Sequence, residues 1–519
     1  MKRLICTIVC LTLAAVTIGG CQNQTEIYKP TGDALVMNDG SVSTGNQTDT
    51  QPTEQELTLI YYPDRSVNPL ESTDYTNRAI MSLVYQGLFS VDRDYNIEPV
   101  LCGSYSISKD MKTYTFYPAQ ATFSDGSALT AQDIEASLLA AQSSPMYAGR
   151  FLHISGIALS GDGGVTVTMD TPCENLPVLL DIPIVKAAEV AALKPLGTGP
   201  YMWDVGGRNV LRRRSDWWCS AEMVVTAQAI FLSTAKDNPQ IRDEFEFEDL
   251  DLVCADPGSD KYADYRCDYE LWDCENGIFL FLACNMDSQV FSNEKVRAAL
   301  PVSVDRDSLA AEYYRGFATA ANLPASPLSP YYSDVLAAKY AYDGSGLTLA
   351  QAVANEGLTG YQITLLVNSD DTLRLRVARD IGKALENSGL IVVMKEVDSA
   401  GYRSALKAGE YDLYLGQTKL SANMDLSAFF AANGALSYGG ISDVGMYALC
   451  AEALANYGNY YSLHQSVLSD GRLCPILFRS YAVYATRGLL TGLTPARDSV
   501  FYYYLGRTME QALIRTEEP

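Results

Sequence analysis

The sequence contains only two histidines, His153 and His464, among its 519 residues. Histidine is the usual general base of Ser-His and Cys-His enzymes and a common metal ligand, so its scarcity argues against both kinds of site. The motifs G-x-S-x-G, H-E-x-x-H, the P-loop and a G-x-G-x-x-G opening a helix are also absent. We interpret each histidine as a packed or surface residue, and we expect no catalytic residues, no metal and no cofactor. Paired carboxylates among the 62 acidic residues leave a glycosidase-like hydrolase open as an alternative.

Positive charge and long apolar runs are scarce too. The chain has 38 Lys and Arg against 62 Asp and Glu, which gives a net charge of −24. So acidic a protein repels nucleic acid and anionic lipid, and we expect neither to bind its surface. Beyond the N-terminal region, no apolar run approaches the ~20 residues of a membrane helix. The roughly 465 residues that follow that region suffice for two or three globular domains.

The N-terminus has the features of a secretory signal peptide. Lys2 and Arg3 precede an apolar run over 4–18, and the sequence I-G-G-C ends at Cys21. The run is too short, and wrongly flanked, for a lasting membrane span. Small residues before a cysteine resemble the bacterial lipobox, in which the peptide is cut before the cysteine and the thiol receives a diacylglycerol. We therefore expect residues 1–20 to be removed and Cys21 to anchor the protein to the outer face of the cytoplasmic membrane. An ordinary signal peptide with a chance cysteine is the alternative.

The segment 21–56 is predicted to be a lipidated, disordered tether. It is rich in Asn, Gln, Thr, Asp, Gly and Ser and shows no apolar period. Such a composition cannot bury enough apolar surface to offset the entropy of ordering. As a flexible coil it would reach on the order of 30–35 Å from the membrane. A disordered N-terminus without a purpose is the alternative.

Twelve cysteines leave the redox state open. Cys6 and Cys10 leave with the signal peptide, and lipid takes Cys21. Nine remain, an odd number, so at least one cannot pair within the chain. No C-x-x-C occurs, and connectivity cannot be deduced from spacing. The nine cysteines can be small buried apolar residues, or some of them can form one or two disulfides. An exported protein is compatible with both alternatives.

The second half of the chain alternates between strand and helix patterns. Strands are predicted over 361–367, 390–397 and 411–415. The helix between the first two is capped by Asp371 or Thr372 and stops at Gly389. This alternation predicts a largely parallel sheet covered on both faces. In the first half we expect strands over 57–62 and 113–117, a helix over 78–86, and a helix opened by Thr130 with Asp133 in its first turn.

Seven short motifs, in order, resemble family 5 of the extracellular solute-binding proteins, the peptide- and nickel-binding group. The ordered set spans roughly residues 57 to 510, and F-S-D-G and G-T-G-P-Y are its most specific members. The motifs are N-P-L at 68–70, Y-x-G-L at 85–88, F-S-D-G at 123–126, L-T-A-x-D at 129–133, G-T-G-P-Y at 197–201, V-R-x-A-L with D-R at 296–306, and G-x-Y-D-L at 409–413.

The resemblance implies an α/β, two-lobed clamp of the periplasmic-binding-protein type, class II, with an extra subdomain in lobe I. It implies a monomer that captures a short peptide or similar solute and delivers it to the permease subunits of an ABC importer. It implies no enzymatic activity. A peptide-sensing receptor of the same fold is the alternative. The expected boundaries are 57–98, 197–283 and 475–519 for lobe I, 99–196 for the subdomain, and 284–474 for lobe II.

The family's amine-binding aspartate is expected after the G-x-Y-D-L strand, near a tryptophan. Here the stretch 416–430 has no tryptophan, and Ala422 stands where that aspartate is expected. Asp425 occupies a second acidic position and is either the N-cap of a helix starting at Leu426 or the partner of a ligand amine. The other polar candidates in this stretch are Gln417, Lys419 and Asn423.

Three further ligand-binding candidates come from the same resemblance. Arg65 and Asn68 belong to the loop after the first strand, where ligands of the family touch the chain. Asn285 follows an expected strand over 278–283, at the crossing into lobe II. The 34 tyrosines suit an adaptable cleft, because each offers a flat face and a hydroxyl group.

Overall fold

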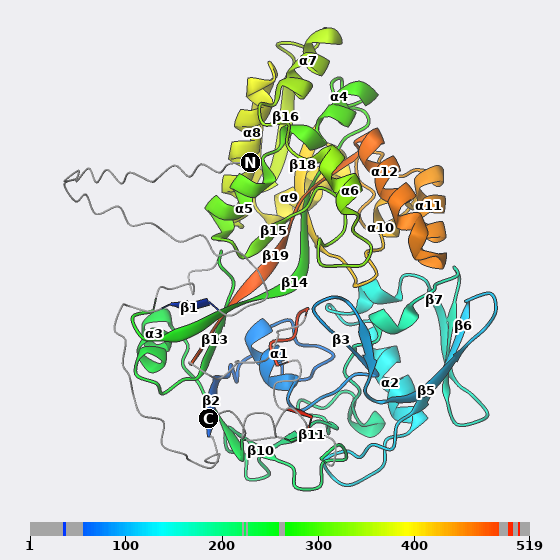
Figure 1. Cartoon of the computed structure of the whole chain (residues 1–519), viewed down its shortest axis with the longest axis vertical. Coiled ribbons are helices and arrows are strands. Elements are labelled where there is room, and N and C mark those ends of the chain that lie inside the picture. Colours follow the sequence, from blue (N-terminus) through cyan, green and yellow to red (C-terminus); the bar gives the residue numbers. More distant parts are fainter. Residues whose placement is uncertain are drawn as a thin grey trace, which may run out of the picture.

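The computed structural model describes residues 35–37, 56–220, 223–224, 227–258, 265–486, 497–501 and 507–508. Two bodies stand one above the other in Figure 1, and two long strands, β14 (Tyr269–Cys284) and β19 (Leu473–Thr486), run from one into the other. We call the lower body lobe I and the upper body lobe II. The predicted two-lobed α/β clamp is confirmed.

A single mixed sheet passes through both lobes. Its main path has the order β17-β16-β18-β14-β19-β13-β2-β12-β10-β9, while β1 pairs with β14 and β15 pairs with β19. The remaining bounds are Leu35–Met37 (β1), Leu57–Ile60 (β2), Tyr201–Trp203 (β9), Val210–Arg213 (β10), Ala229–Ser233 (β12), Leu252–Ala255 (β13), Ala318–Ala320 (β15), Gln362–Asn368 (β16), Ile391–Val397 (β17) and Leu413–Lys419 (β18).

The prediction of a largely parallel sheet is correct for only part of the sheet. β16 lies parallel to β17 and β18, and β2 lies parallel to β12 and β13. In the centre, β14 is antiparallel to both β18 and β19. The chain enters lobe II along β14 and returns along β19, so these neighbours run in opposite directions. The connection between the lobes thus imposes the antiparallel centre.

Helices pack around the sheet of lobe II (Figure 1). The best predicted is α8, where the carboxylate of the N-cap Asp371 accepts the N–H of Arg374 at 2.9 Å. Its apolar stripe, which includes Val377 and Ile381, is buried as expected. The bounds are Glu294–Ala299 (α4), Arg306–Tyr314 (α5), Asp334–Ala337 (α6), Leu347–Asn355 (α7), Thr372–Asn387 (α8), Ser399–Ala408 (α9), Ser427–Phe430 (α10), Val444–Ala455 (α11) and Tyr460–Asp470 (α12).

A four-stranded antiparallel sheet, β5-β6-β8-β7, forms most of the subdomain in lobe I. Its strands are Cys102–Ile107 (β5), Thr113–Pro118 (β6), Ile154–Leu159 (β7) and Val165–Met169 (β8). Helix α2 (Ala131–Ala141) begins at the predicted N-cap, Thr130. The carboxylate of Asp133 reaches back and accepts the Thr130 N–H at 2.9 Å, which fixes the first turn.

Lobe I has further elements besides these strands and helix α2. They are α1 (Tyr75–Met81), β3 (Phe89–Val91), β4 (Ile97–Pro99) and α3 (Asn238–Glu246), together with the short pair β11 (Met223–Val224) and β20 (Arg507–Thr508). The G-T-G-P-Y motif packs on the chain that leaves α1. A Cβ atom on Gly197 would lie 2.2 Å from the carbonyl oxygen of Val84, and one on Gly199 would lie 2.6 Å from that of Leu83. The motif therefore needs glycine for close backbone approach.

The crossing between the lobes contains an irregularity in β14. The ladder with β19 shifts register between Glu275 and Phe279, and Gly277 has φ +71°. β14 pairs with β18 of lobe II from Ile278 onward, so the crossing lies before that residue. The boundary expected at 283/284 lies further along the same strand. We call residues 275–279 the hinge bulge.

Two expectations concern the N-terminal region that precedes lobe I. The signal peptide and Cys21 lie outside the described residues. Of the expected tether, the structure describes residues 35–37 and 56, and residues 35–37 form strand β1, which pairs with the first residues of β14. The nine remaining cysteines are free thiols, and all except Cys267 are buried. They are Cys102, Cys173, Cys219, Cys254, Cys267, Cys274, Cys284, Cys450 and Cys474. Of the two interpretations of these nine, the structure agrees with buried apolar residues.

The bend at Gly197 provides a test of this packing. We expect Gly197→Ala to lower the free energy of unfolding by about 1–3 kcal/mol, because its Cβ would meet the fixed carbonyl of Val84. Gly161→Ala is the control, since a Cβ there meets nothing within 4 Å, and should stay within about 0.5 kcal/mol of wild type. Urea denaturation measures both. Equal stability of the two variants would contradict the close approach.

Candidate functional site

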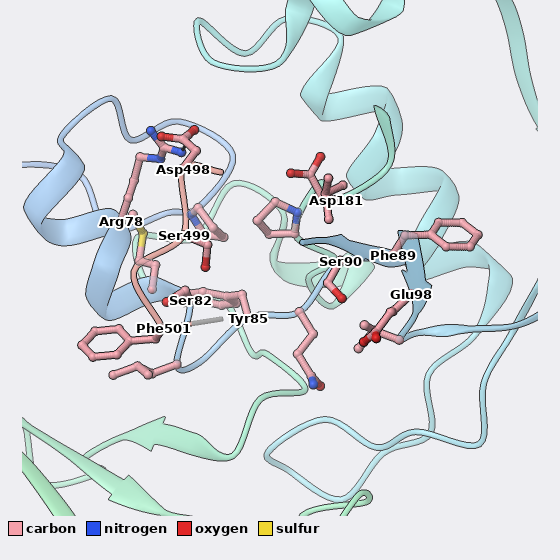
Figure 2. A pocket seen from close by; sticks show the side chains of 18 of the residues that line it. Arg78, Ser82, Tyr85, Phe89, Ser90, Glu98, Asp181, Asp498, Ser499 and Phe501 are labelled. Carbon is pink, nitrogen blue, oxygen red and sulfur yellow. Dashed lines mark hydrogen bonds and ion pairs between the residues drawn. The ribbon is translucent and has the colours of Figure 1, made fainter. Parts of the chain in front are cut away.

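A cavity of about 460 Å³ lies in lobe I, against the subdomain and beside lobe II. It is lined by α1 and the chain that follows it, by parts of the subdomain, by residues 217–219 and by the segment 497–501 (Figure 2). Its volume falls in the range of ~300–1,000 Å³ that is typical of small-ligand sites. We call it the lobe I cavity.

Aromatic side chains form one part of the wall. Trp217 and Trp218 line the cavity, and their indole N–H groups donate to the carbonyl oxygen of Thr198 at 3.0 and 3.2 Å. Thr198 belongs to the G-T-G-P-Y bend, so this structural motif also holds both indoles in place. Phe89 and Phe501 add apolar surface. Such a wall offers flat faces for a ligand to pack against.

The other part of the wall contains the buried carboxylate of Asp498. It is ion-paired with Arg78 of α1 in lobe I and with Lys419 of β18 in lobe II. Figure 2 shows Arg78, Asp498 and Ser499 together at one end of the cavity. The backbone N–H of Asp498 also donates to the carbonyl oxygen of Glu275 in the hinge bulge, at 2.7 Å. Asp498 therefore joins both lobes and the hinge.

Arg497 lies beside this carboxylate and also lines the cavity. Its guanidinium donates to the carbonyl oxygen of Leu420 in lobe II and lies 5.8 Å from the ring centre of Tyr95. The Tyr95 hydroxyl donates to Glu275, whose second oxygen accepts the Ser326 hydroxyl at 2.6 Å. Arg497 is thus surrounded by residues of lobe I, the hinge and lobe II.

Burial and charge shift the pKa values of this cluster in definite directions. Burial raises the pKa of Asp498, but Arg78 and Lys419 outweigh it and hold the pKa well below its usual range. Burial and the cations Arg78 and Arg497 outweigh the pairing with Asp498 and lower the pKa of Lys419 to about 7. Burial raises the pKa of Glu275. Of these influences, only the pairing with Asp498 favours the charged form of Lys419.

Acidic groups lie elsewhere on the cavity wall. Asp181 and Glu98 line it, and Asp181 forms an ion pair with Arg150. In Figure 2, Asp181 and Glu98 lie well apart from the pair of Arg78 and Asp498. The cavity wall therefore carries two ion pairs, Arg78 with Asp498 and Arg150 with Asp181, so charges of both signs line it.

The predicted site residue Asp425 contacts the subdomain. Its Oδ2 lies 3.1 Å from Nε2 of His153, and its Oδ1 accepts the backbone N–H of Ser427 at 2.9 Å. Helix α10 begins at Ser427 with Leu426 as its N-cap, so the expected cap at Asp425 is wrong by one residue. His153 is a packed residue, as expected. The Asp425 carboxylate is engaged within the protein, and its contact with a ligand stays a prediction.

The other three candidates from lobe II, Lys419, Gln417 and Asn423, lie in different surroundings. Lys419 reaches the charged end of the lobe I cavity through Asp498. The side-chain oxygen of Gln417 accepts a hydrogen bond from Arg479 at 3.2 Å. Asn423 is buried, and its carbonyl oxygen accepts the Tyr460 hydroxyl.

Arg65, Asn68 and Asn285 are held by nearby groups of the protein. Arg65 is paired with Asp74. The Asn68 amide donates to the carbonyl oxygens of residues 190 and 192 at 2.8 and 2.9 Å, which ties the loop to the subdomain. The Asn285 amide donates to the carbonyl oxygens of residues 409 and 411 at 3.1 and 2.8 Å. Their predicted contacts with a ligand remain predictions.

Sequence reasoning missed Arg78, Arg497 and Asp498. Arg78 is one basic residue on a short helix, and it lies 420 positions before Asp498. No motif marks the segment 497–501. The available signal was a pair of adjacent opposite charges, R-D, near the end of a very acidic chain, and it does not by itself indicate a site.

The contact of His153 with Asp425 predicts a pH dependence. Burial lowers the pKa of His153, but its hydrogen bond to Asp425 and the nearby Asp170 outweigh this and raise it. A raised pKa stabilises the fold fully below the unfolded value near 6.5, and this stabilisation is lost as pH rises through the folded pKa. We expect Asp425→Asn to cost about 1 kcal/mol more at pH 6 than at pH 8.5.

Urea denaturation at both pH values measures this difference. Asp170→Asn is the matched control, because the Asp170 side chain also contacts His153 but is 55% exposed, and its effect should be smaller. A cost of Asp425→Asn that does not change with pH would show that His153 is neutral in this contact.

Comparison with known proteins identifies the family. The model of bacterial extracellular solute-binding proteins, family 5 (middle region), matches residues 96–437. The glutathione-binding protein GsiB of Pectobacterium atrosepticum is 26% identical over 374 residues, which cover 66% of this chain and 69% of GsiB.

Solved structures agree in fold. NikA from Brucella suis, in complex with Fe(III)-EDTA, aligns with a TM-score of 0.67 at 17% identity over 88% of this chain and 100% of NikA. AppA from Bacillus subtilis, in complex with a nonapeptide, aligns with a TM-score of 0.61 at 18% identity over the same shares of the two chains. The motifs, the clamp and the match over 96–437 together show that this chain belongs to family 5 of the bacterial extracellular solute-binding proteins.

Proposed function

We propose that the protein captures a short peptide or a similar small solute and delivers it to the permease of an ABC importer. The observation that carries the proposal is the lobe I cavity, whose wall includes a carboxylate, Asp498, that is ion-paired to lobe II. A solute in this cavity lies next to the contact between the lobes. Binding can therefore favour the closed arrangement, which a permease would distinguish from the open one.

The relatives support a peptide-like solute. GsiB is named for glutathione, and the AppA structure contains a nonapeptide. A cavity whose wall carries both arginines and carboxylates suits a ligand that carries both charges. Aromatic walls suit backbone and side-chain packing with little selectivity for sequence.

The proposed location is the outer face of the cytoplasmic membrane. The signal sequence and Cys21 support export and a lipid anchor, with the segment 21–56 as the tether. Among the described residues, no helix is long and apolar enough to cross a membrane. We propose a monomer whose membrane attachment depends on the lipid.

Ligand binding and closure can be measured together. We expect the purified protein to bind at least one member of a panel of di- to hexapeptides, including glutathione, in isothermal titration calorimetry. Small-angle scattering should then show a smaller radius of gyration with that ligand, because closure adds contacts between the lobes. Failure to bind any member would contradict the peptide assignment. An unchanged radius at saturation would contradict ligand-driven closure.

Anchoring has its own test. We expect Cys21→Ala to move the protein from the membrane fraction to the soluble fraction, since the thiol that accepts the lipid is lost. Immunoblots of fractions washed with high salt measure the distribution, and Cys102→Ala serves as a control outside the signal region. Retention of the Cys21 variant in the washed membrane pellet would contradict the lipid anchor.

A further inference from the structure

His153 lies between two carboxylates that belong to different lobes. It directly precedes β7 of the subdomain, and Figure 1 shows this end of the subdomain next to α10 and α11 of lobe II. Its Nδ1 lies 3.2 Å from Oδ1 of Asp170, in the subdomain, and its Nε2 lies 3.1 Å from Oδ2 of Asp425, in lobe II. The side chains of His153 and Asp425 are 7% and 10% exposed, whereas that of Asp170 is 55% exposed. The contact that crosses between the lobes is therefore the buried one.

The charged form of His153 fits this position better than the neutral form. An ionised carboxylate only accepts hydrogen bonds, and a neutral imidazole has a single N–H, so it can satisfy only one of the two carboxylates. The Ser427 hydroxyl does not supply the missing donor, because it donates to Oδ1 of Asp425 at 2.6 Å. Its oxygen lies 3.1 Å from Nε2 of His153 and is a second acceptor there. An imidazolium, which donates from both nitrogens, satisfies all three groups.

The other titratable groups around this contact include two thiols and two phenols, and burial raises the pKa of each. They are Cys173, with a pKa of about 12, and Cys450, Tyr447 and Tyr460. These groups remain uncharged near neutral pH. The charged neighbours have partners of their own: Arg150 is paired with Asp181, and the Glu174 carboxylate accepts the N–H of Tyr457 at 3.0 Å. His153 is thus the group at this contact whose ordinary pKa lies near neutral pH.

Closure of the lobes changes the proton affinity of His153. Burial lowers its pKa, but the hydrogen bond to Asp425 and the nearby Asp170 outweigh burial and raise it. Separation of the lobes removes Asp425 but leaves Asp170, which belongs to the same subdomain as His153. The closed arrangement therefore binds the proton more tightly than the open one, and protonation favours closure. This effect is complete below the pKa of the open arrangement and is lost as pH rises through the pKa of the closed one.

We propose that His153 and Asp425 form a proton-operated latch, which holds the subdomain against lobe II while His153 is charged and releases it when His153 loses its proton. The inference adds regulation to the proposed function and rests on it, because a latch requires lobes that open and close. Arg150 lines both the lobe I cavity and a small cavity beside His153 and Asp425. The latch thus adjoins the place that a solute would occupy. A solute captured at lower pH is released more readily as the pH rises.

Histidine NMR tests the protonation directly. The chain has only two histidines, and burial lowers the pKa of His464 to about 3, so only His153 should titrate between pH 6 and pH 8.5. We expect a pKa above ~6.5 in the wild type. Asp425→Asn should lower the proton affinity of His153 by about 10-fold, since it removes an opposite charge at hydrogen-bond distance. Identical titration of His153 in the two proteins would overturn the latch.

Small-angle scattering of the ligand-free protein tests the motion. We expect the wild-type radius of gyration to be larger at pH 8.5 than at pH 6, because loss of the proton releases the subdomain from lobe II. His153→Gln and Asp425→Asn should each remove this difference. Asp170→Asn is the matched control, because that carboxylate stays beside His153 in both arrangements, and the difference should remain in this variant.

Two results of the scattering experiment would overturn the latch. One is an equal wild-type radius at the two pH values, and the other is a difference that persists in both His153→Gln and Asp425→Asn. The second result would assign the pH response to another contact, such as the pair of Lys419 and Asp498. Circular dichroism at both pH values checks that the variants are folded. Neither measurement uses a ligand, so failure of the latch leaves the proposed function standing, whereas the proposed function fails in the calorimetric test of peptide binding.

Discussion

A buried carboxylate must be paired with cations, and at Asp498 those cations come from different lobes. Arg78 comes from the first helix of lobe I, and Lys419 comes from the end of a strand in lobe II. Removing a carboxylate from water is costly unless such partners remain in contact with it. Separation of the lobes would strip Lys419 from Asp498 and expose the cluster to water. The arrangement of the lobes and the electrostatics of the cavity therefore depend on each other.

The sheet makes this coupling possible. β14 and β19 continue through both lobes, so the connection is a hydrogen-bonded ribbon with one irregularity, the hinge bulge. Gly277 gives the bulge its positive φ and also leaves room for the Arg497 guanidinium. A change in the bulge would therefore move a charged group on the cavity wall. At a distance from the hinge, the subdomain contacts lobe II through His153 and Asp425 and through Glu174, whose N–H donates to the carbonyl oxygen of Leu454.

The sequence predicted local structure best where a short pattern determines it. The cap at Asp371 and the turn at Thr130 and Asp133 depend only on neighbouring residues. The two-lobed fold followed from the ordered motifs. The antiparallel centre of the sheet did not, because strand direction there depends on how the chain returns from lobe II. The site was predicted least well: Asp425 was noticed, but its partner His153 lies 272 positions away, and no local pattern joins Arg78 to Asp498.

The coupling of the lobes through Asp498 can be measured directly as a distance. Spin labels introduced as non-natural amino acids at exposed positions 161, in the subdomain, and 444, at the start of α11, would report the separation of the lobes by pulsed electron resonance. The wild-type protein should show a population at short distance that decreases in Asp498→Asn and in Lys419→Met, because each variant removes the ion pair between the lobes. Asp204→Asn, which affects ion pairs within lobe I, should leave the distribution unchanged. Identical distributions in the wild type and Asp498→Asn would contradict the coupling.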